Sequence, residues 1–437
     1  MMNSAFARCY GLAARTNTLC GALRAGQAMR FHVGLLKECR TMNTGIDRRR
    51  FISTAAAGTV IALKPSLVFG TQANSKITLG LIGCGGRGNW IADLFQETGK
   101  YQFVACADYF EDRAKASGSR LQVDAQRCYS GLSGYRRLLE QDLDAVVIET
   151  PPYFHPEQSM AAVDAGKHVF VAKPIAVDVP GCKTIAAAGR KATQRKLVFL
   201  VDFQTRANEF YQEAVRRVHA GDMGPLVLGE AHYPWEGGGR GGPPANNEEC
   251  LRNWYYVLEI SGDFIVEQSI HALDVATWIV DGDPVRAVGA GGRKLRPANS
   301  IYDHFAVNYW FPDDVLLSFT SIQSIPGVRD QITCRFFGAE GVIETDYFSG
   351  VIIRGRKSYK GGQFDYLYTT GTQANIETFY QSITAGQYAN ETVPASVRSN
   401  LTAIMGREAA YRGTEVTWQD LLQSEVRLTP DLTGLKS

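Results

Sequence analysis

From residue 77 to about 200, short apolar runs alternate with helix-like patterns. The apolar runs cover 77–82, 101–107, 143–148 and 168–171, and apolar residues recur at helical spacing over 89–95 and 157–165. Buried strands that alternate with helices are typical of a parallel sheet, whose ligands lie at the carboxyl ends of its strands. We therefore expect an α/β domain with a parallel sheet in this part of the chain.

The second half shows the two-residue alternation of antiparallel strands. A helix is predicted over 207–220, with a stop at 221–225, and a strand over 226–233. Alternating patterns then cover 285–292, 303–311, 315–322, 329–337 and 341–355, and helical patterns cover 374–386 and 395–412. A mainly antiparallel sheet with accompanying helices is expected. Because 437 residues exceed what one core usually holds, we expect a leader at 1–73, a first domain at 74–200 and a second at 201–437.

Residues 47–53, Asp-Arg-Arg-Arg-Phe-Ile-Ser, resemble a twin-arginine export signal. The apolar stretch 54–63 that follows is too short to span a membrane and suits a cleavable signal. Met42 is a more typical start for such a signal, so residues 1–41 can be a misassigned extension. The alternative is a basic arm with a chance apolar stretch. We expect the export machinery as a partner and a periplasmic or exported location.

Composition narrows the classes of function. Residues 1–73 hold ten Lys/Arg and two Asp/Glu, whereas the remainder holds 36 and 42, a net charge of −6. A mildly acidic body argues against a nucleic-acid-binding protein. No run of 18 apolar residues occurs, so no permanent membrane span is expected. The nine cysteines form no C-x-x-C pair, which argues against a zinc or disulfide framework.

The first chemical signal is the turn Gly83-Cys84-Gly85-Gly86-Arg87-Gly88, which reads G-x-G-x-x-G between a predicted strand and a predicted helix. In a dinucleotide site, Gly83 would make the turn, Gly85 would admit the phosphate, and Gly88 would pack helix on strand. The helix N-terminus, with Gly86 and Arg87, would present N–H groups to the anion.

Asp108 ends the second predicted strand, 25 residues after Gly83. A carboxylate there can accept hydrogen bonds from an adenosine ribose and would repel a 2′-phosphate, which favours NAD over NADP. The alternative is an ordinary aspartate at a strand end.

Two further motifs follow predicted strands: Thr150-Pro151-x-x-x-His155 and Lys173-Pro174. With the glycine turn and Asp108, they resemble the Gfo/Idh/MocA oxidoreductases over about residues 76–425. The resemblance implies an α/β fold, with an N-terminal Rossmann dinucleotide-binding domain and a C-terminal α/β domain built on a large, mainly antiparallel open sheet. It also implies NAD(P) use on sugars, cyclitols or polyols, with Thr150, Pro151, His155 and Lys173 at the cofactor.

The family motif Glu-Lys-Pro is replaced here by Ala172-Lys173-Pro174. The resemblance implies that Lys173 polarises the reacting hydroxyl. In the family, the resemblance implies, the glutamate of this motif helps to hold the nicotinamide side. Because Ala172 replaces it here, the orientation of the cofactor is left open.

Glu267 and His271 are four residues apart and would share a face if this segment is helical. A carboxylate beside an imidazole suits proton transfer, with Glu267 orienting His271. The family pattern is Asp-x-x-x-His, so Glu267 departs from it by one methylene. A histidine in a structural contact is one alternative, and a metal site with His155 is another. The absence of H-E-x-x-H and of other clustered ligands argues against metal.

Weaker candidates concern the substrate. Gln204 and Arg206 follow a predicted strand and could bond sugar hydroxyls, and His304 begins a strand that could reach the same cleft. Trp235 and Arg240 flank a glycine-rich loop that is either near the cleft or a surface connection.

Three hypotheses of function follow. The first is an exported NAD-dependent oxidoreductase of a sugar, polyol or glycoside, with Lys173 stabilising the alkoxide and His271 accepting its proton. The second is an NAD-dependent glycosidase or lyase that oxidises, eliminates and re-reduces. The third is a non-catalytic nucleotide- or sugar-binding protein. Export favours a tightly bound nucleotide, and the second domain is expected to support a homo-oligomer.

Overall fold

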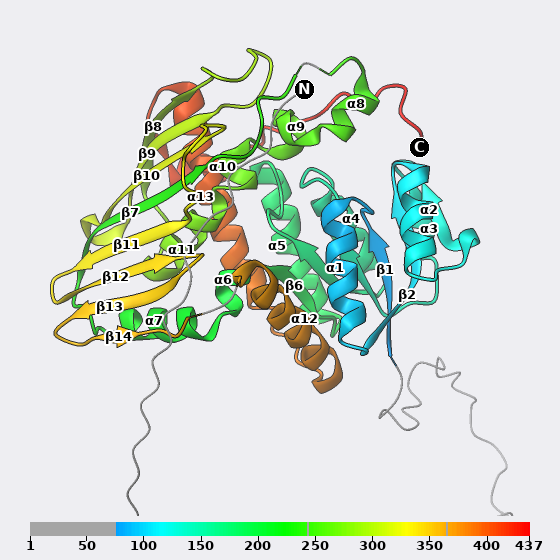
Figure 1. Cartoon of the computed structure of the whole chain (residues 1–437), viewed down its shortest axis with the longest axis horizontal. Coiled ribbons are helices and arrows are strands. Elements are labelled where there is room, and N and C mark those ends of the chain that lie inside the picture. The colour runs from blue at the N-terminus through cyan, green and yellow to red at the C-terminus, as the bar shows by residue number, and fades with distance from the viewer. Residues whose placement is uncertain (1–75, 243, 364–365) are drawn as a thin grey trace, which may run out of the picture. The chain divides into compact units, whose positions relative to one another are not determined.

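The computed structural model describes residues 76–437, apart from 243, 364 and 365. The predicted leader, with the arginines of 47–53, lies outside the described residues. Two sheets organise the described chain, one parallel and one mainly antiparallel (Figure 1). This arrangement confirms the predicted fold class.

The first sheet has six strands, and every pairing is parallel. In spatial order the strands are β3 (Cys128–Ser130), β2 (Tyr101–Asp108), β1 (Ile77–Ile82), β4 (Ala145–Ile148), β5 (His168–Ala172) and β6 (Phe199–Asp202). The connecting helices are α1 (Gly86–Glu97), α2 (Glu111–Arg120), α3 (Gly134–Leu139), α4 (His155–Asp164) and α5 (Val179–Gln194), with a 3₁₀ turn at Ala125–Arg127. The predicted domain boundary at residue 200 falls inside β6.

The second sheet has nine strands, and only the pair β7 and β10 is parallel within it. In spatial order they are β14 (Tyr359–Lys360), β13 (Gly350–Gly355), β12 (Gly341–Asp346), β11 (Thr333–Gly338), β7 (Leu226–Trp235), β10 (Leu316–Gln323), β9 (His304–Trp310), β8 (Arg286–Gly292) and β15 (Val416–Thr417). The longer helices of this half are α7 (Glu209–His219), α11 (Ile270–Val280), α12 (Leu367–Ala385) and α13 (Thr392–Arg412). The short ones are α6 (Gln204–Ala207), α8 (Asn247–Arg252), α9 (Leu258–Ser261), α10 (Phe264–Glu267) and α14 (Trp418–Leu422), with 3₁₀ turns at Trp254–Tyr256 and Pro312–Asp314.

Some predicted elements have different bounds. The pattern 341–355 is a hairpin of two strands, β12 and β13, and not one strand. The predicted helix 207–220 begins only after Asn208, whose side chain accepts hydrogen bonds from the backbone N–H groups of Phe210 and Tyr211 and so caps α7. Both C-terminal helices begin earlier than predicted.

Helix α12 packs on the first sheet although it lies late in the chain. Its residues Ile376 and Phe379 are buried in the same core as Leu79 and Phe95, and the Lys100 ammonium pairs with the Glu377 carboxylate. Figure 1 shows α12 beside α1. A helix from the second half therefore completes the hydrophobic core that packs against the parallel sheet.

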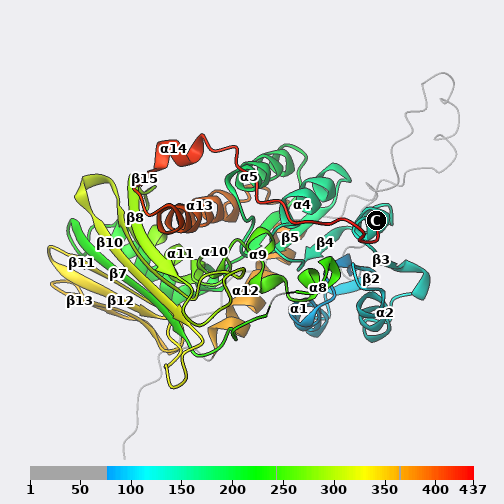
Figure 2. The same ribbon diagram turned by 90° about the horizontal axis from the view of Figure 1, so that it is seen from above.

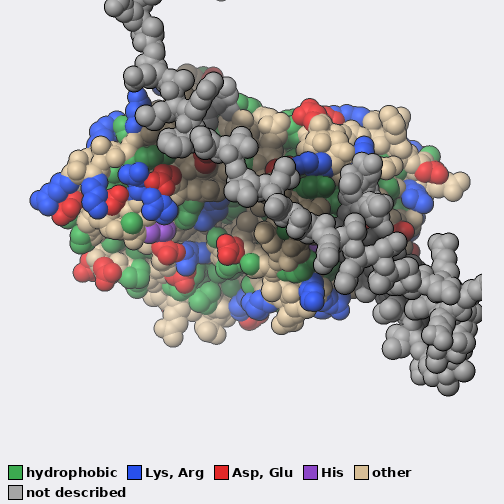
Figure 3. Space-filling view, turned by 90° about the horizontal axis from the view of Figure 1, so that it is seen from below, with side chains coloured by type: hydrophobic (Ala, Val, Ile, Leu, Met, Phe, Trp, Pro, Cys, Tyr) green, Lys and Arg blue, Asp and Glu red, His purple; other side chains and the backbone are tan. Residues whose placement is uncertain are grey.

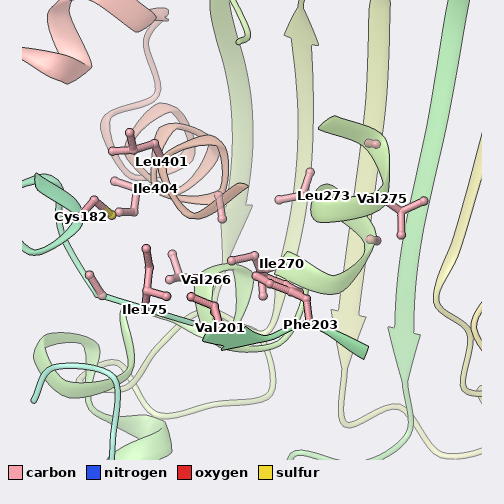
Figure 4. Packing of buried hydrophobic residues seen from close by; sticks show 14 of the residues in the cluster. Ile175, Cys182, Val201, Phe203, Val266, Ile270, Leu273, Val275, Leu401 and Ile404 are labelled. Carbon is pink, nitrogen blue, oxygen red and sulfur yellow. The ribbon is translucent and has the colours of Figure 1, made fainter. Parts of the chain in front are cut away.

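A single hydrophobic core also joins the two sheets. It contains residues just after strands of the first sheet, Ile175 after β5 and Phe203 after β6, together with Ile270 of α11 and Ile404 of α13. Figure 4 shows part of this core, and Figure 2 shows α13 running between α5 and the second sheet. Because the core is continuous, the residues between the two sheets are held in fixed relative positions.

On the part of the surface visible in Figure 3, basic and acidic side chains are interspersed. On the second sheet, for example, Arg335 pairs with Glu230 and with Glu344. Among the described residues, no helix combines the length and apolar character needed to cross a membrane.

Candidate active site

The glycine turn has the geometry that a dinucleotide site requires. Gly83 has a φ of +98°, in the region that favours glycine. A Cβ there would lie 2.5 Å from the backbone carbon of Glu149, and a Cβ on Gly88 would lie 1.9 Å from the carbonyl oxygen of Gly83. Neither position has room for a side chain, so the strand, turn and helix are in contact through backbone atoms.

The other two glycines of the turn border open space. A Cβ on Gly85 or Gly86 would meet nothing within 4 Å. Gly85 is the N-cap of α1 and offers no side chain to accept from the N–H groups of the first turn. These free donors and the positive end of the helix dipole suit a phosphate. The turn therefore fits the pyrophosphate of a dinucleotide.

Asp108 connects the glycine turn to the end of β2. Its carboxylate accepts hydrogen bonds from the backbone N–H groups of Cys84, at 2.7 Å, and Phe110, at 2.9 Å. Burial raises the pKa of Asp108, while these two hydrogen bonds lower it. Asp108 lines a pocket of about 100 Å³ with Gly83 and Gly85. This position suits the predicted contact with an adenosine ribose, which stays a prediction.

A larger cleft of about 450 Å³ adjoins this pocket, since Glu149 and Thr150 line both. Lys173, Glu267 and His271 lie together in it. Much of the rest of its wall is aromatic: Tyr233, Trp235, Trp254, Tyr255, Tyr347, Phe348, Tyr366 and Tyr368. Trp235 thus lies in the cleft, whereas Arg240 is not among the lining residues.

Lys173 emerges from the carboxyl end of β5 and points at Glu267. Its ammonium donates to the backbone carbonyl of Glu267 at 2.8 Å, and the Glu267 carboxylate lies 3.4 Å away. The two side chains are only 11% and 15% exposed. Burial lowers the pKa of Lys173, and the charge of Glu267 opposes that shift.

His271 lies in the first turn of α11 and is buried beside the aromatic rings of Phe203 and Tyr347. Burial lowers its pKa well below the usual value, and the positive charges of Lys173 and Arg87 lower it further. Its Nδ1 makes no hydrogen bond to the described residues. The ring is therefore neutral at neutral pH and able to accept a proton.

The predicted pairing of Glu267 with His271 is not what the structure contains. Helix α10 ends at Glu267 and α11 begins at Ile270, so the two residues do not belong to one continuous helix. The hydrogen bonds described for the Glu267 carboxylate and carbonyl go to Lys173. Glu267 is thus placed to hold the lysine and not the histidine.

Arg87 is the centre of a charged cluster whose partners the sequence did not indicate. It donates to Asp202 at 2.7 Å and to the Tyr368 hydroxyl at 2.5 Å, and its Nε lies 3.2 Å from the Glu149 carboxylate. The Glu149 side chain is fully buried, which raises its pKa to about 8 against the opposing charge of Arg87. Arg87 also lies over the ring of Trp90. Its side chain lines the larger cleft, while its backbone belongs to the glycine turn.

Glu149 also bears on the missing family glutamate. In the sheet, Ile148 of β4 pairs with Val171 of β5, so Glu149 and Ala172 come next at the same level. At the level of Ala172, a carboxylate is therefore present on Glu149, directly after the neighbouring strand β4.

Thr150 and Pro151 line the smaller pocket with Gly83 and Gly85, and their contact with the cofactor stays a prediction. His155 is buried and borders the larger cleft. Its ring nitrogens lie 2.8 Å from the Pro174 carbonyl and 2.6 Å from the Thr150 carbonyl. Burial lowers the pKa of His155 to about 4, although the two carbonyl acceptors favour the protonated ring. His155 thus connects the segment after β4 to the segment after β5 and positions both.

Gln204, Arg206 and His304, which were predicted as substrate residues, do not line the cleft. Gln204 is fully buried and donates to the Asp202 carboxylate. Arg206 pairs with the buried Asp274 at 2.9 Å, and His304 lies 2.6 Å from its neighbour Asp303. Each polar group therefore has a carboxylate partner inside the fold. Within the described residues, no group of three or more His, Cys, Asp or Glu side chains is arranged to hold a metal ion.

The fold and these contacts define a Rossmann-type dinucleotide-binding protein with a buried lysine and a neutral histidine in an adjoining cleft. Comparison with known families places it more closely. Residues 77–201 match the oxidoreductase family with an NAD-binding Rossmann fold, and residues 211–344 match the Gfo/Idh/MocA C-terminal domain. The chain belongs to the Gfo/Idh/MocA oxidoreductase family, which confirms the predicted resemblance.

Individual proteins of known name share limited sequence identity with this chain. An inositol 2-dehydrogenase of Klebsiella pneumoniae is 30% identical over 210 residues, 48% of this chain and 56% of its own. A glycosyl hydrolase family 109 protein of Solibacter usitatus is 28% identical over 199 residues, 44% of this chain and 42% of its own. The chain thus spans about half the length of the curated relatives it matches. A levoglucosan dehydrogenase solved with NADH and levoglucosan shares the fold, with a TM-score of 0.65 and 18% identity over 78% of this chain and 99% of that one.

Replacing Glu267 with Gln removes the carboxylate that opposes the lowering of the Lys173 pKa. We expect the alkaline limb of the pH–rate profile to move to lower pH, because Lys173 then loses its proton sooner. The acidic limb, set by His271, should stay in place. Turnover of a polyol with NAD across pH measures both limbs.

Glu267→Asp keeps the charge and serves as the matched control, so it should restore much of the alkaline limb. A shift confined to the acidic limb in Glu267→Gln would instead assign Glu267 to His271.

Proposed function

We propose that the protein is an NAD(P)-dependent oxidoreductase that acts on a CH–OH group of a sugar, polyol or glycoside. The observation that carries the proposal is the placement of the Lys173 ammonium and the neutral His271 ring in one cleft beside the glycine turn. These are the two groups that oxidation of an alcohol needs: a cation for the developing alkoxide and an acceptor for its proton.

Lys173 acts by charge. Because it is buried, its ammonium interacts with an alkoxide more strongly than it would in water. The Glu267 carbonyl accepts one of its three N–H bonds and so fixes the direction in which the remaining donors point. Lys173 thus binds the hydroxyl oxygen, and Glu267 orients Lys173.

His271 takes the proton. Its lowered pKa keeps the ring neutral in the resting enzyme, and its free Nδ1 has no competing donor among the described residues. As the proton arrives, the Lys173 and Arg87 charges disfavour the imidazolium and promote its onward transfer to solvent.

The aromatic wall indicates the class of substrate. Rings such as Tyr255, Tyr347 and Trp235 offer apolar faces with polar groups at their edges. A cyclic polyol has the matching character, with C–H groups on its faces and hydroxyls around its rim. The relatives named as inositol and levoglucosan dehydrogenases support this assignment.

The nicotinamide nucleotide supplies the hydride acceptor when it is bound. The glycine turn would hold its pyrophosphate and Asp108 its adenosine ribose, which favours NAD over NADP. Thr150 lines both that pocket and the cleft, and Pro151 lines the pocket beside it.

A second candidate is an NAD-dependent glycosidase or lyase that oxidises the sugar transiently, eliminates and returns the hydride. The similarity to a glycosyl hydrolase family 109 protein favours it. Lys173 and His271 would serve its oxidation step in the same way.

We further propose twin-arginine export to the periplasm, supported by residues 47–53 of the sequence. An exported enzyme benefits from a nucleotide that stays bound, because free NADH is not regenerated there. We also propose a homo-oligomer formed through the second domain.

Replacing Lys173 with Met should reduce hydride transfer by about 100-fold or more, since the cation beside the reacting oxygen is lost. NAD affinity should change little. Single-turnover absorbance of the reduced nicotinamide and titration of NAD binding measure the two quantities.

Lys115→Met is the matched control, because Lys115 is exposed and pairs only with Glu111 on α2. Unchanged turnover in Lys173→Met would defeat the assignment. NAD binding without reduction by any polyol in the wild type would support a binding protein instead.

Incubation with aryl glycosides and no added acceptor separates the two catalytic candidates. The dehydrogenase proposal predicts reduced nucleotide in proportion to the oxidised sugar and no release of aglycone. Released aglycone without net NADH would establish the glycosidase or lyase.

Exchange of both Arg48 and Arg49 for Lys should retain the protein in the cytoplasm, because the export signal is read through its paired arginines. Fractionation and immunoblotting measure the distribution. Lys64→Arg, elsewhere in the leader, should leave export unchanged, and equal periplasmic fractions for the wild type and both variants would contradict the proposal.

A further inference from the structure

The nucleotide pocket has two walls that come from different parts of the chain. One wall consists of the segments that follow β2 and β3, with Tyr109, Phe110 and Leu132. The other consists of α8 and the 3₁₀ turn after it, with Leu251 and Trp254. A dinucleotide with its pyrophosphate on the glycine turn would lie between these walls, so its release requires them to separate.

Residues 424–437 bridge the two walls from outside. On the first wall, the N–H of Leu132 donates to the carbonyl of Lys436 at 2.9 Å, and the N–H of Lys436 lies 3.4 Å from the Tyr109 hydroxyl. On the second wall, the amide of Asn247 in α8 donates to the carbonyl of Thr433 at 3.0 Å. Figure 2 shows this segment running from α14 past α5 and α4 to the C-terminal end beside the first sheet.

The same segment covers a small apolar cluster that the walls share. The cluster has three fully buried members, Phe110, Leu251 and Ile260, and Leu432 and Leu435 are among the half-buried residues packed against it. A cluster of this size is easily opened, because few apolar contacts hold it together. Leu432 and Leu435 are the residues of this segment that cover the cluster, beside residues of both walls such as Tyr109 and Trp254.

The segment is anchored before it reaches the pocket. The N–H of Leu428 donates to the Asp178 carboxylate at 2.9 Å, at the start of α5. At its far end, the segment approaches Gly131 closely: a Cβ on Gly131 would lie only 2.4 Å from the backbone oxygen of Ser437. The close approach at Gly131 depends on the absence of a side chain there.

We propose that residues 424–437 form a latch that positions the two walls of the dinucleotide pocket and slows release of the bound nucleotide. The latch touches the walls and not the nucleotide, so its members are positioning residues. The inference rests on the proposed nucleotide binding but not on the chemistry at Lys173.

Release of NADH tests the latch directly. NADH bound to the full chain is chased with excess NAD⁺, and the fluorescence decay gives the release rate. Replacing Leu432 and Leu435 together with Ser, or ending the chain after Gln423, should speed release by about tenfold or more. Glu425→Gln, which removes only a surface ion pair with Lys183, should not.

Two further readouts separate a latch from general destabilisation. ADP-ribose should be released faster by the same factor as NADH, because the latch acts on the adenosine end of the pocket. Asn247→Ala should speed release in the full chain but add little in the shortened chain, since its partner Thr433 is then gone.

Equal release rates in the wild type and in the double leucine variant would overturn the latch, as would additive effects of Asn247→Ala and shortening. These outcomes leave the sugar reaction unaffected, whereas a failure of the proposed function appears as absent NAD binding or absent hydride transfer in the wild type.

Discussion

The hydrogen bond from the Lys173 ammonium to the Glu267 carbonyl joins the two halves of the molecule inside the cleft. Burial lowers the pKa of Lys173, and the Glu267 carboxylate offsets part of that effect. Lys173 follows β5 and Glu267 ends α10, so the contact persists only while both sheets keep their positions. The shared core around Phe203 and Ile270 keeps them there. The electrostatics of the cleft thus depend on apolar packing outside it.

Local signals were sufficient for strands β1, β2, β4 and β5 of the first sheet and for the glycine turn, but not for the short strand β3. The predicted runs 77–82 and 143–148 are mainly apolar and are followed by Gly83 and Glu149. Gly83 and Gly88 are required by backbone contacts within the turn and with the segment that follows β4. The break between α10 and α11 was not predictable in this way. Its residues Gln268 and Ser269 carry no glycine or proline signal, and their side chains bond to Tyr255 and Ser321, which lie 13 and 52 residues away in the sequence.

The cleft residues missed by the sequence all depend on long-range contacts. Arg87 is 115 residues from Asp202 and 281 from Tyr368, and nothing in its own neighbourhood indicates either partner. Gln204 and Arg206 were predicted to contact the substrate because their chemistry and their place near a strand end are suitable. Their side chains instead bind the internal carboxylates of Asp202 and Asp274. Partner choice follows from tertiary proximity, which spacing along the chain does not contain.

The return of α12 to the first sheet makes the two halves interdependent in folding. Without Ile376 and Phe379, the side chains of Phe95 and Phe170 would lose part of their cover. Strands β1 to β6 therefore form a complete sheet but an incomplete core, and they cannot acquire their final packing until most of the chain has been synthesised. A protein that must fold fully before it can seal its own nucleotide-binding half assembles as one cooperative body, not as two modules joined by a linker.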